Sequence, residues 1–455
     1  MSTIGWKARF LKWAALTLPV LGIIFAGATV GTAQRSTPAG APVTFSKDVA
    51  PILYRSCVRC HHPNDIAPMS LITYQDARPW AASIKSRVSK REMPPWFLDK
   101  NIGIQQYKND PSLSDAEVAT IVKWVDSGSP QGNPADMPPP PQIDDANVWS
   151  IGKPDLIVNY PAFKMPAAGP DLFGALETPF GIPEDRYIKA IQSRVVDDAS
   201  RKVVHHALSF AVPPSQTDNN TLGDDSGGGS GLFLVEYASG KSATVYPPDA
   251  GLMLPANQTA RVEYHFHSIG EEVNTKIQLG IVFYPKGYVP KHVQWSKQLG
   301  QDSATDLDIP AGQVVRRDGY TRVNSAVRLI AWQPHMHIRG KYQCLELIYP
   351  SEPVRTETVT CANWNYNWHT IYSYADDVTP LVPKGTLLHV ITWYDNTSTN
   401  KFNPDPKNWV GAGTGRTIDE MGFSWIGWYD MTDDEYKTAL AERRAQQAKT
   451  TQQQQ

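Results

Sequence analysis

The chain has 455 residues, too many for one ordinary hydrophobic core, and its length predicts several domains of roughly 100 to 200 residues each. The formal net charge is −2 and the basic residues are scattered among acidic ones, which argues against a basic surface and against nucleic acid as a partner. The 37 prolines and 32 glycines favour turns and β-structure over helical bundles, so the fold is predicted to be mostly β.

Residues 1–33 have the order of a secretory signal peptide. Lys7, Arg9 and Lys12 precede an apolar run from Trp13 to about Val30, and small residues follow that run. The run approaches the length of a membrane span, so an uncleaved anchor is the alternative, and only then would the membrane be a partner. Under either interpretation, the rest of the chain is expected to be periplasmic or otherwise exported.

Residues 42–132 are predicted to form an α-helical domain. Ser114 and Glu117 have the spacing of a capping box in front of a periodic apolar run, and the helix is expected to stop at Gly128. Residues 133–146 follow as a linker that is too rich in proline for a helix or a central strand.

From Asn147 to about Tyr429, short alternating or apolar runs separated by turn residues predict antiparallel β-sandwiches. The stretch is too long for one sandwich, and a proline-flanked break in its middle predicts two jelly-roll-like sandwiches in tandem, over residues 147–287 and 288–431. Residues 432–455 are expected to form a capped helix that runs into a polar, disordered glutamine tail.

The four cysteines form two pairs. Cys344 and Cys361 flank the segment 349–353, which is predicted to turn between two short strands, so the two side chains are expected to face each other across a hairpin. An exported protein lies in an oxidising compartment, and a disulfide is therefore predicted for this pair.

The other pair belongs to a C-x-x-C-H motif formed by Cys57, Cys60 and His61. In this motif two thiols add to the vinyl groups of the porphyrin and the histidine binds the iron, so one covalent haem c is predicted. A zinc half-site is the alternative, but it would need a second ligand pair nearby, and the sequence has none. His62 is expected to be an exposed neighbour.

An electron-carrying haem needs a second axial ligand on the opposite face of the iron. Met93 is predicted to be this ligand, because two following prolines stiffen a loop that could hold its thioether at a fixed distance. Met69 is the main alternative, and Met137 is a third candidate.

Three histidine doublets lie in apolar runs: His205-His206, His265-Phe266-His267 and His335-Met336-His337. In a strand, residues i and i+2 point to one face, so each H-x-H pair can offer two imidazoles to one metal. The adjacent pair would need a β-bulge or a strand end to do the same. Imidazole suits copper, zinc, iron and nickel, and an added thioether favours Cu(I).

Four segments resemble, in this order, the copper type II ascorbate-dependent monooxygenases, the family of the peptidylglycine and dopamine hydroxylases. They are residues 204–207, 263–270, 333–340 and 417–421. The resemblance extends over residues 147–429 and implies two copper ions. One ion would be held by His205, His206 and His265, and the other, where oxygen is activated, by His335, His337 and Met421.

The remaining histidines are given no ligand role by this resemblance. His267 is interpreted as a neighbour of the first copper, and His292, His369 and His389 are expected to be structural. Two positions depart from the peptide hydroxylase pattern: Gln333 stands where an arginine would grip a substrate carboxylate, and Trp425 stands where a tyrosine is expected. These departures argue against a peptide with a free carboxylate and favour a more apolar substrate.

The sequence thus predicts an enzyme, a haem c and dicopper monooxygenase that hydroxylates a C–H bond of a small organic substrate with O₂. A periplasmic donor would supply electrons through the fused cytochrome c domain, whose tether raises its effective concentration at the copper domains. The main alternative is a haem and copper electron-transfer or sensor protein without oxygenase activity. A copper-handling protein and a zinc hydrolase are further alternatives.

Overall fold

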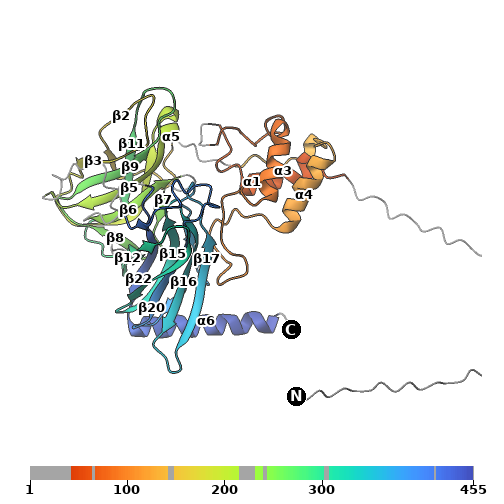
Figure 1. Ribbon diagram of the computed structural model, residues 1–455. Helices are drawn as coiled ribbons and strands as arrows, with labels where there is room; N and C mark the ends of the chain where they lie inside the picture. Colours follow the sequence, from red (N-terminus) through yellow and green to blue (C-terminus); the bar gives the residue numbers. More distant parts are fainter. Residues whose placement is uncertain are drawn as a thin grey trace, which may run out of the picture. The chain divides into compact units, whose positions relative to one another are not determined.

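The computed structural model describes residues 42–63, 67–141, 148–214, 231–238, 243–301, 307–413 and 417–453 (Figure 1). The predicted signal segment 1–33 and part of the predicted linker, residues 142–146, lie outside these ranges. Within the described ranges, no helix is both long enough and apolar enough to cross a bilayer.

Short helices occupy the first part of the described chain. They are a π-helix over Phe45–Val49, α1 over Ala50–Ser56, α2 over Tyr74–Ala77, a 3-10 helix over Arg78–Trp80, α3 over Ala81–Ser89 and α4 over Asp115–Asp126. They share a core that includes the fully buried side chains of Phe45, Leu53 and Trp124.

The predicted cap of α4 is confirmed. The Ser114 hydroxyl accepts a hydrogen bond from the Glu117 backbone N–H, and the Glu117 carboxylate accepts one from the Ser114 backbone N–H. The helix ends at Asp126, and Gly128 then adopts a φ of +91°, a conformation that few other residues take without strain.

Between α3 and α4 part of the chain packs against β-structure, whereas Leu113 joins the helical core. The backbone N–H of Asp99 donates to the carbonyl of Cys361 (2.9 Å), and that of Ile104 donates to the carbonyl of Val359 (2.9 Å). Leu98 joins the core of the second half of the β-structure described below. The first part of the chain is therefore attached to the β-structure by backbone hydrogen bonds, which the sequence did not predict.

The first half of the β-structure consists of two sheets that share one core. One sheet has the order β3-β9-β5-β6 and the other contains β1-β11-β4-β8, with β7 beside β4. The strands are β1 (Leu156–Asn159), β2 (Lys164–Met165), β3 (Leu172–Pro179), β4 (Arg186–Val195), β5 (Val204–Val212), β6 (Leu232–Ala238), β7 (Ala243–Val245), β8 (Ala250–Leu254), β9 (Thr259–Phe266), β10 (Val273–Asn274) and β11 (Ile277–Phe283), with helix α5 (Asp198–Val203) before β5.

The second half repeats this two-sheet arrangement around a second core, with the order β14-β20-β16-β17 facing β12-β22-β15-β18. Its strands are β12 (His292–Gln301), β13 (Asp308–Ile309), β14 (Val314–Arg322), β15 (Ala326–Met336), β16 (Gly340–Tyr349), β17 (Arg355–Asn363), β18 (Tyr372–Ser373), β19 (Leu381–Val382), β20 (Leu387–Asp395), β21 (Val410–Gly411) and β22 (Gly422–Met431). A parallel pairing of β8 with β12 joins the two halves into one sheet, and nearly all other pairings are antiparallel. The expectation of a mostly β fold is confirmed.

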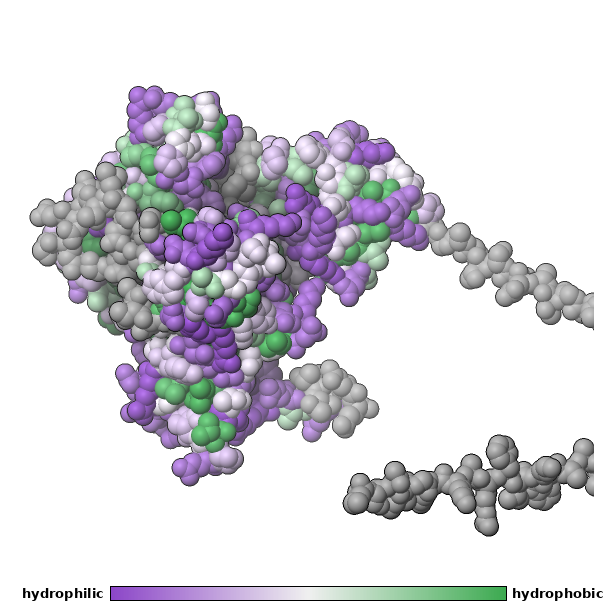
Figure 2. Space-filling view, viewed as in Figure 1, coloured by the Kyte–Doolittle hydropathy of each residue, from purple (hydrophilic) through white to green (hydrophobic). Residues whose placement is uncertain are grey.

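Helix α6 (Asp433–Gln453) ends the described chain, and Thr432 caps its start through reciprocal hydrogen bonds with Glu435. Figure 2 shows a face that is largely hydrophilic, on which the hydrophobic patches are small and separate. Apolar side chains are therefore gathered mainly in the three cores.

The predicted disulfide is confirmed. Cys344 on β16 and Cys361 on β17 lie directly opposite each other in the antiparallel pairing and are bonded.

Removing this bond with Cys344→Ala and Cys361→Ala is expected to lower the free energy of unfolding by about 3 kcal/mol, because the crosslink restricts the unfolded chain over a loop of 17 residues. Urea unfolding of the two proteins, followed by tryptophan fluorescence, measures the difference. Labelling of Cys344 and Cys361 themselves, located by peptide mapping of the unfolded, unreduced protein, would contradict the pairing.

Candidate metal centre

Three of the predicted ligands come together at one end of the β3-β9-β5-β6 sheet. The pairing of β5 with β9 shifts register between Val204 and His206, which places a bulge at His205. The adjacent histidines can therefore both approach His265 on β9, as the sequence required. One ligand atom from each of His205, His206 and His265 lies within 4.8 Å of the others, and these three are called the first histidine set.

The ring nitrogens of this set fit a metal ion. Nδ1 of each of the three histidines is buried and has no hydrogen-bond partner among the described residues. A buried polar atom without a partner is costly, and a metal ion would remove that cost. Imidazole nitrogens are ligands for copper and zinc alike, so the donor set fits copper without excluding zinc.

Asp171 fixes the orientation of His265. Its carboxylate lies 2.7 Å from Nε2 of His265 and 2.8 Å from Nδ1 of His267, and Phe173 stacks on the His265 ring. The hydrogen bond from His265 lowers the pKa of Asp171 to about 2. A carboxylate bound to the second ring nitrogen is the usual support of a metal-binding histidine, and it leaves Nδ1 of His265 as the ligand atom. His267 is exposed and lies outside the first histidine set.

Burial favours the neutral form of His205 and His206. It lowers the pKa of His205 to about 3 and that of His206 well below the usual value. Neutral imidazole is the form that binds metals, so these two histidines do not need to lose protons at physiological pH before they can bind one.

The second ligand set consists of His335, His337 and Met421, which lie where β15 ends and β22 begins. In the antiparallel register His335 is opposite Phe423 and Met336 is opposite Gly422. His337 directly follows β15 in the chain and Met421 directly precedes β22. Nδ1 of His337 is 2.9 Å from the Asp419 carbonyl oxygen, which leaves Nε2 as the available nitrogen. Burial lowers the pKa of His337 to about 4.

Glu420 holds the backbone beside this second ligand set. Its buried carboxylate accepts hydrogen bonds from the backbone N–H groups of His337 (2.9 Å) and Arg339 (2.6 Å). The chain segment that carries His337 is therefore tied to the segment that carries Met421.

Apolar side chains surround Met421. It forms one cluster with the buried side chains of Phe423 and Trp425, and Leu208 and Phe233 pack against the cluster from the first half. The Trp425 ring stacks on Phe233 with centroids 4.5 Å apart. None of the members of this cluster carries a charge.

A buried polar pair that the sequence did not indicate lies between the two ligand sets. Glu236 on β6 has an oxygen 3.1 Å from Nδ1 of His369 and accepts a hydrogen bond from the Gln333 amide (2.7 Å). All three side chains are less than 7% exposed. The His369 ring lies 4.9 Å from that of His206 and 5.3 Å from that of His335. His369 was expected to be structural, and the sequence did not indicate its position beside the two ligand sets.

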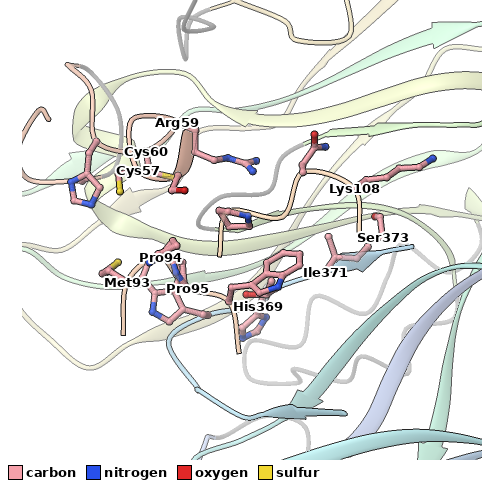
Figure 3. Close-up of a pocket in the computed structure, with 18 of the residues that line it drawn as sticks. Cys57, Arg59, Cys60, Met93, Pro94, Pro95, Lys108, His369, Ile371 and Ser373 are labelled. Atoms are coloured by element: carbon pink, nitrogen blue, oxygen red, sulfur yellow. The ribbon is translucent and has the colours of Figure 1, made fainter. Parts of the chain in front are cut away.

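The C-x-x-C-H motif lines a cavity of about 720 Å³, which is within the roughly 300 to 1,000 Å³ of cofactor pockets. Figure 3 shows the sulfur atoms of Cys57, Cys60 and Met93 at this cavity, with Pro94 and Pro95 beside Met93. Arg59 and Lys108 also line it, which suits a ligand with carboxylate groups. The cavity thus offers two thiols, a histidine and a thioether, the donor set that a haem c requires.

The three predicted methionine candidates differ in position, and Met137 packs against the helical core. Met93 lines the cavity with His61, whereas Met69 packs against the helical core and its carbonyl lies 3.2 Å from Nδ1 of His61. That hydrogen bond leaves Nε2 of His61 as the nitrogen that is available to a metal. His62, expected to be exposed, is 6% exposed, and its Nδ1 lies 2.9 Å from the Pro63 carbonyl oxygen.

Comparisons with known proteins give no family for the chain: no family model and no curated protein matches it. Among solved structures, PNGase F, a glycosylasparaginase from Flavobacterium meningosepticum, aligns over 61% of this chain and 96% of its own at 11% identity, with a TM-score of 0.25. A T13 infectious bursal disease virus particle aligns over 61% and 73% at 9% identity, with a TM-score of 0.16. Scores this low carry no argument about fold or function.

Proposed function

We propose that this chain is an exported haem c and dicopper monooxygenase that hydroxylates a C–H bond of an apolar organic substrate. The observation that carries the proposal is the first histidine set, whose three buried Nδ1 atoms have no partner among the described residues. The second ligand set, with the soft donor Met421 at the end of a neighbouring strand, supports a copper ion rather than zinc at that position.

When bound, two copper ions would each supply one electron for the insertion of one oxygen atom, and haem c would return those electrons. The residues of the chain set the positions of the donors. Asp171 orients His265, the Asp419 carbonyl orients His337, and Glu420 ties together the two segments of the second ligand set. Donors held in this way need little rearrangement when a metal changes its oxidation state.

The surroundings of Met421 support an apolar substrate. Phe423, Trp425 and Phe233 pack around it and would exclude water. Gln333, which stands where the related peptide hydroxylases would have an arginine, donates its amide to the buried carboxylate of Glu236. A second carboxylate brought near Glu236 would be repelled, so a substrate with a free carboxylate is disfavoured.

Residues 42–132 are proposed to be a cytochrome c domain, with haem c bonded to Cys57 and Cys60 and bound by His61 and Met93. The position of all four side chains on one cavity supports this assignment. The Cys344–Cys361 disulfide supports an oxidising compartment, in agreement with the proposed export.

Metal analysis and oxygen consumption test the proposal on the full chain. We expect two copper ions and one covalent haem per chain, and oxygen uptake matched one to one by a hydroxylated product when a reductant and an apolar substrate library are supplied. Copper and haem without oxygen uptake would favour the electron-transfer alternative. Zinc at both histidine sites would favour a hydrolase.

A further inference from the structure

The loop of residues 364–371 joins β17 to β18 and contacts both ligand sets. The indole N–H of Trp364 donates to the backbone oxygen of His337 (2.9 Å). The Tyr366 ring stacks with the ring of His205, with centroids 6.4 Å apart. One loop of the second half thus reaches a residue of each set.

His369 on this loop makes ring contacts with a histidine of each set. Its ring centroid lies 4.9 Å from that of His206 and 5.3 Å from that of His335. The ring centroids within the first histidine set are separated by 4.8 to 5.5 Å. His369 is therefore as near to a member of each set as the members of the first set are to one another.

The position of His369 is fixed by hydrogen bonds as well as by packing. Glu236 lies 3.1 Å from Nδ1 of His369 and is itself bound by Gln333, and all three side chains are buried. The ligand atoms that lie within 4.8 Å of one another belong to the first histidine set, so His369 lies beside that set rather than in it. A positioned neighbour, not a first-set ligand, is the role that this geometry supports.

His369 also lines the cavity of the C-x-x-C-H motif. The residues of the loop that form the cavity wall are Trp368, His369, Thr370 and Ile371. Figure 3 shows His369 and Ile371 at the same cavity as Cys57 and Cys60. The same imidazole therefore borders the proposed haem cavity and contacts both ligand sets.

We propose that His369 is the residue through which single electrons pass from the haem cavity to the ligand sets. The inference rests on the proposed function, because it needs haem c as donor and copper as acceptor. In the step, one electron leaves ferrous haem and reduces Cu(II) to Cu(I), and no covalent bond is made or broken. Electron tunnelling is faster through packed atoms than across a gap, and the His369 ring supplies packed atoms on both sides.

A flash-reduction experiment on the full chain, with haem attached and both sites loaded with Cu(II), tests this role. A photoreductant reduces the haem, and haem absorbance follows its re-oxidation while the copper signal in electron paramagnetic resonance (EPR) follows electron arrival. In His369→Gln we expect haem re-oxidation to slow severalfold, because loss of the ring leaves a gap in the packed path between the cavity and the ligand sets. Copper content, the EPR spectrum of Cu(II) and direct reduction of copper by ascorbate should stay as in the unchanged protein.

His389→Gln is the matched control. His389 is also buried and bonded to carboxylates, with Glu346 3.0 Å from Nδ1 and Asp318 2.7 Å from Nε2, and it is in neither ligand set. Its variant should keep the original rate. If His369→Gln is not recovered folded, Glu236→Gln permits the same measurement, because it keeps the imidazole of His369 and weakens the hydrogen bond that positions it. A slower rate is expected there too, because the ring is then held less firmly on the path.

An unchanged rate in His369→Gln would overturn the inference and leave the proposed function intact. Loss of copper or an altered EPR spectrum in this variant alone would overturn it as well, because His369 would then be a ligand. If the wild-type protein does not bind haem or copper, that result would instead contradict the proposed function, and the inference that rests on it.

Discussion

Met421→Ile is expected to abolish hydroxylation while the fold, the first histidine set and the haem remain intact. The thioether of Met421 is the one soft donor of the second ligand set, and without it Cu(I) at that set loses a preferred ligand. Isoleucine has a similar volume, so the loss of folding stability should stay below about 1.5 kcal/mol. The measurements are copper content per chain, the yield of hydroxylated product and the thermal midpoint.

Met431→Ile is the matched control for this prediction. Met431 lies on the same strand as the residues that follow Met421, and both methionines are 8% exposed. Met431 packs with Leu381 and Tyr429, away from the proposed ligands, so its variant should retain turnover. Normal turnover in Met421→Ile would mean that Met421 only fills space and that the second copper site is wrongly assigned.

Cys57→Ala is expected to abolish normal covalent haem attachment, because each thiol forms one of the two bonds to the porphyrin and only one bond would remain possible. Cys60→Ala should behave in the same way. The measurement is haem staining on a denaturing gel, together with the haem spectrum after extraction. Ser56→Ala, a change in the buried side chain next to Cys57, is the control and should keep the haem attached. A covalent haem of normal spectrum in Cys57→Ala would refute the attachment site.

Met93→Ala separates the two methionine candidates within the same experiment. It should leave the haem attached, shift its spectrum and lower its reduction potential, because a methionine axial ligand raises the potential. Met69→Ala should do neither, because Met69 packs against the helical core. A spectrum that changes in Met69→Ala and not in Met93→Ala would reverse the assignment.

Features that depend on neighbours in the chain could be predicted from the sequence. The capping box of Ser114 and Glu117 spans four residues, and the Cys344–Cys361 disulfide closes a single hairpin; both are confirmed. The mostly β fold also followed from local patterns of apolar and turn residues. Two adjacent histidines in a strand can bind the same metal ion only if a bulge or a strand end turns one of them, and the structure has a bulge at His205. These features depend on how far apart their residues are in the chain, and that spacing can be read directly from the sequence.

The supports of the site were decided by tertiary structure. Asp171 is 94 residues from His265, and Glu236 is 97 residues from Gln333 and 133 from His369. No short-range pattern marks these partners, because sheet pairing and the packing of the two halves bring them together. The same holds for the backbone hydrogen bonds that Asp99 and Ile104 make with β17. The sequence by itself therefore determined the candidate donors. Only the tertiary structure decided which carboxylates orient those donors and that His369 lies between the two ligand sets. The reason is that packing selects partners by their position in space and not by their position in the chain.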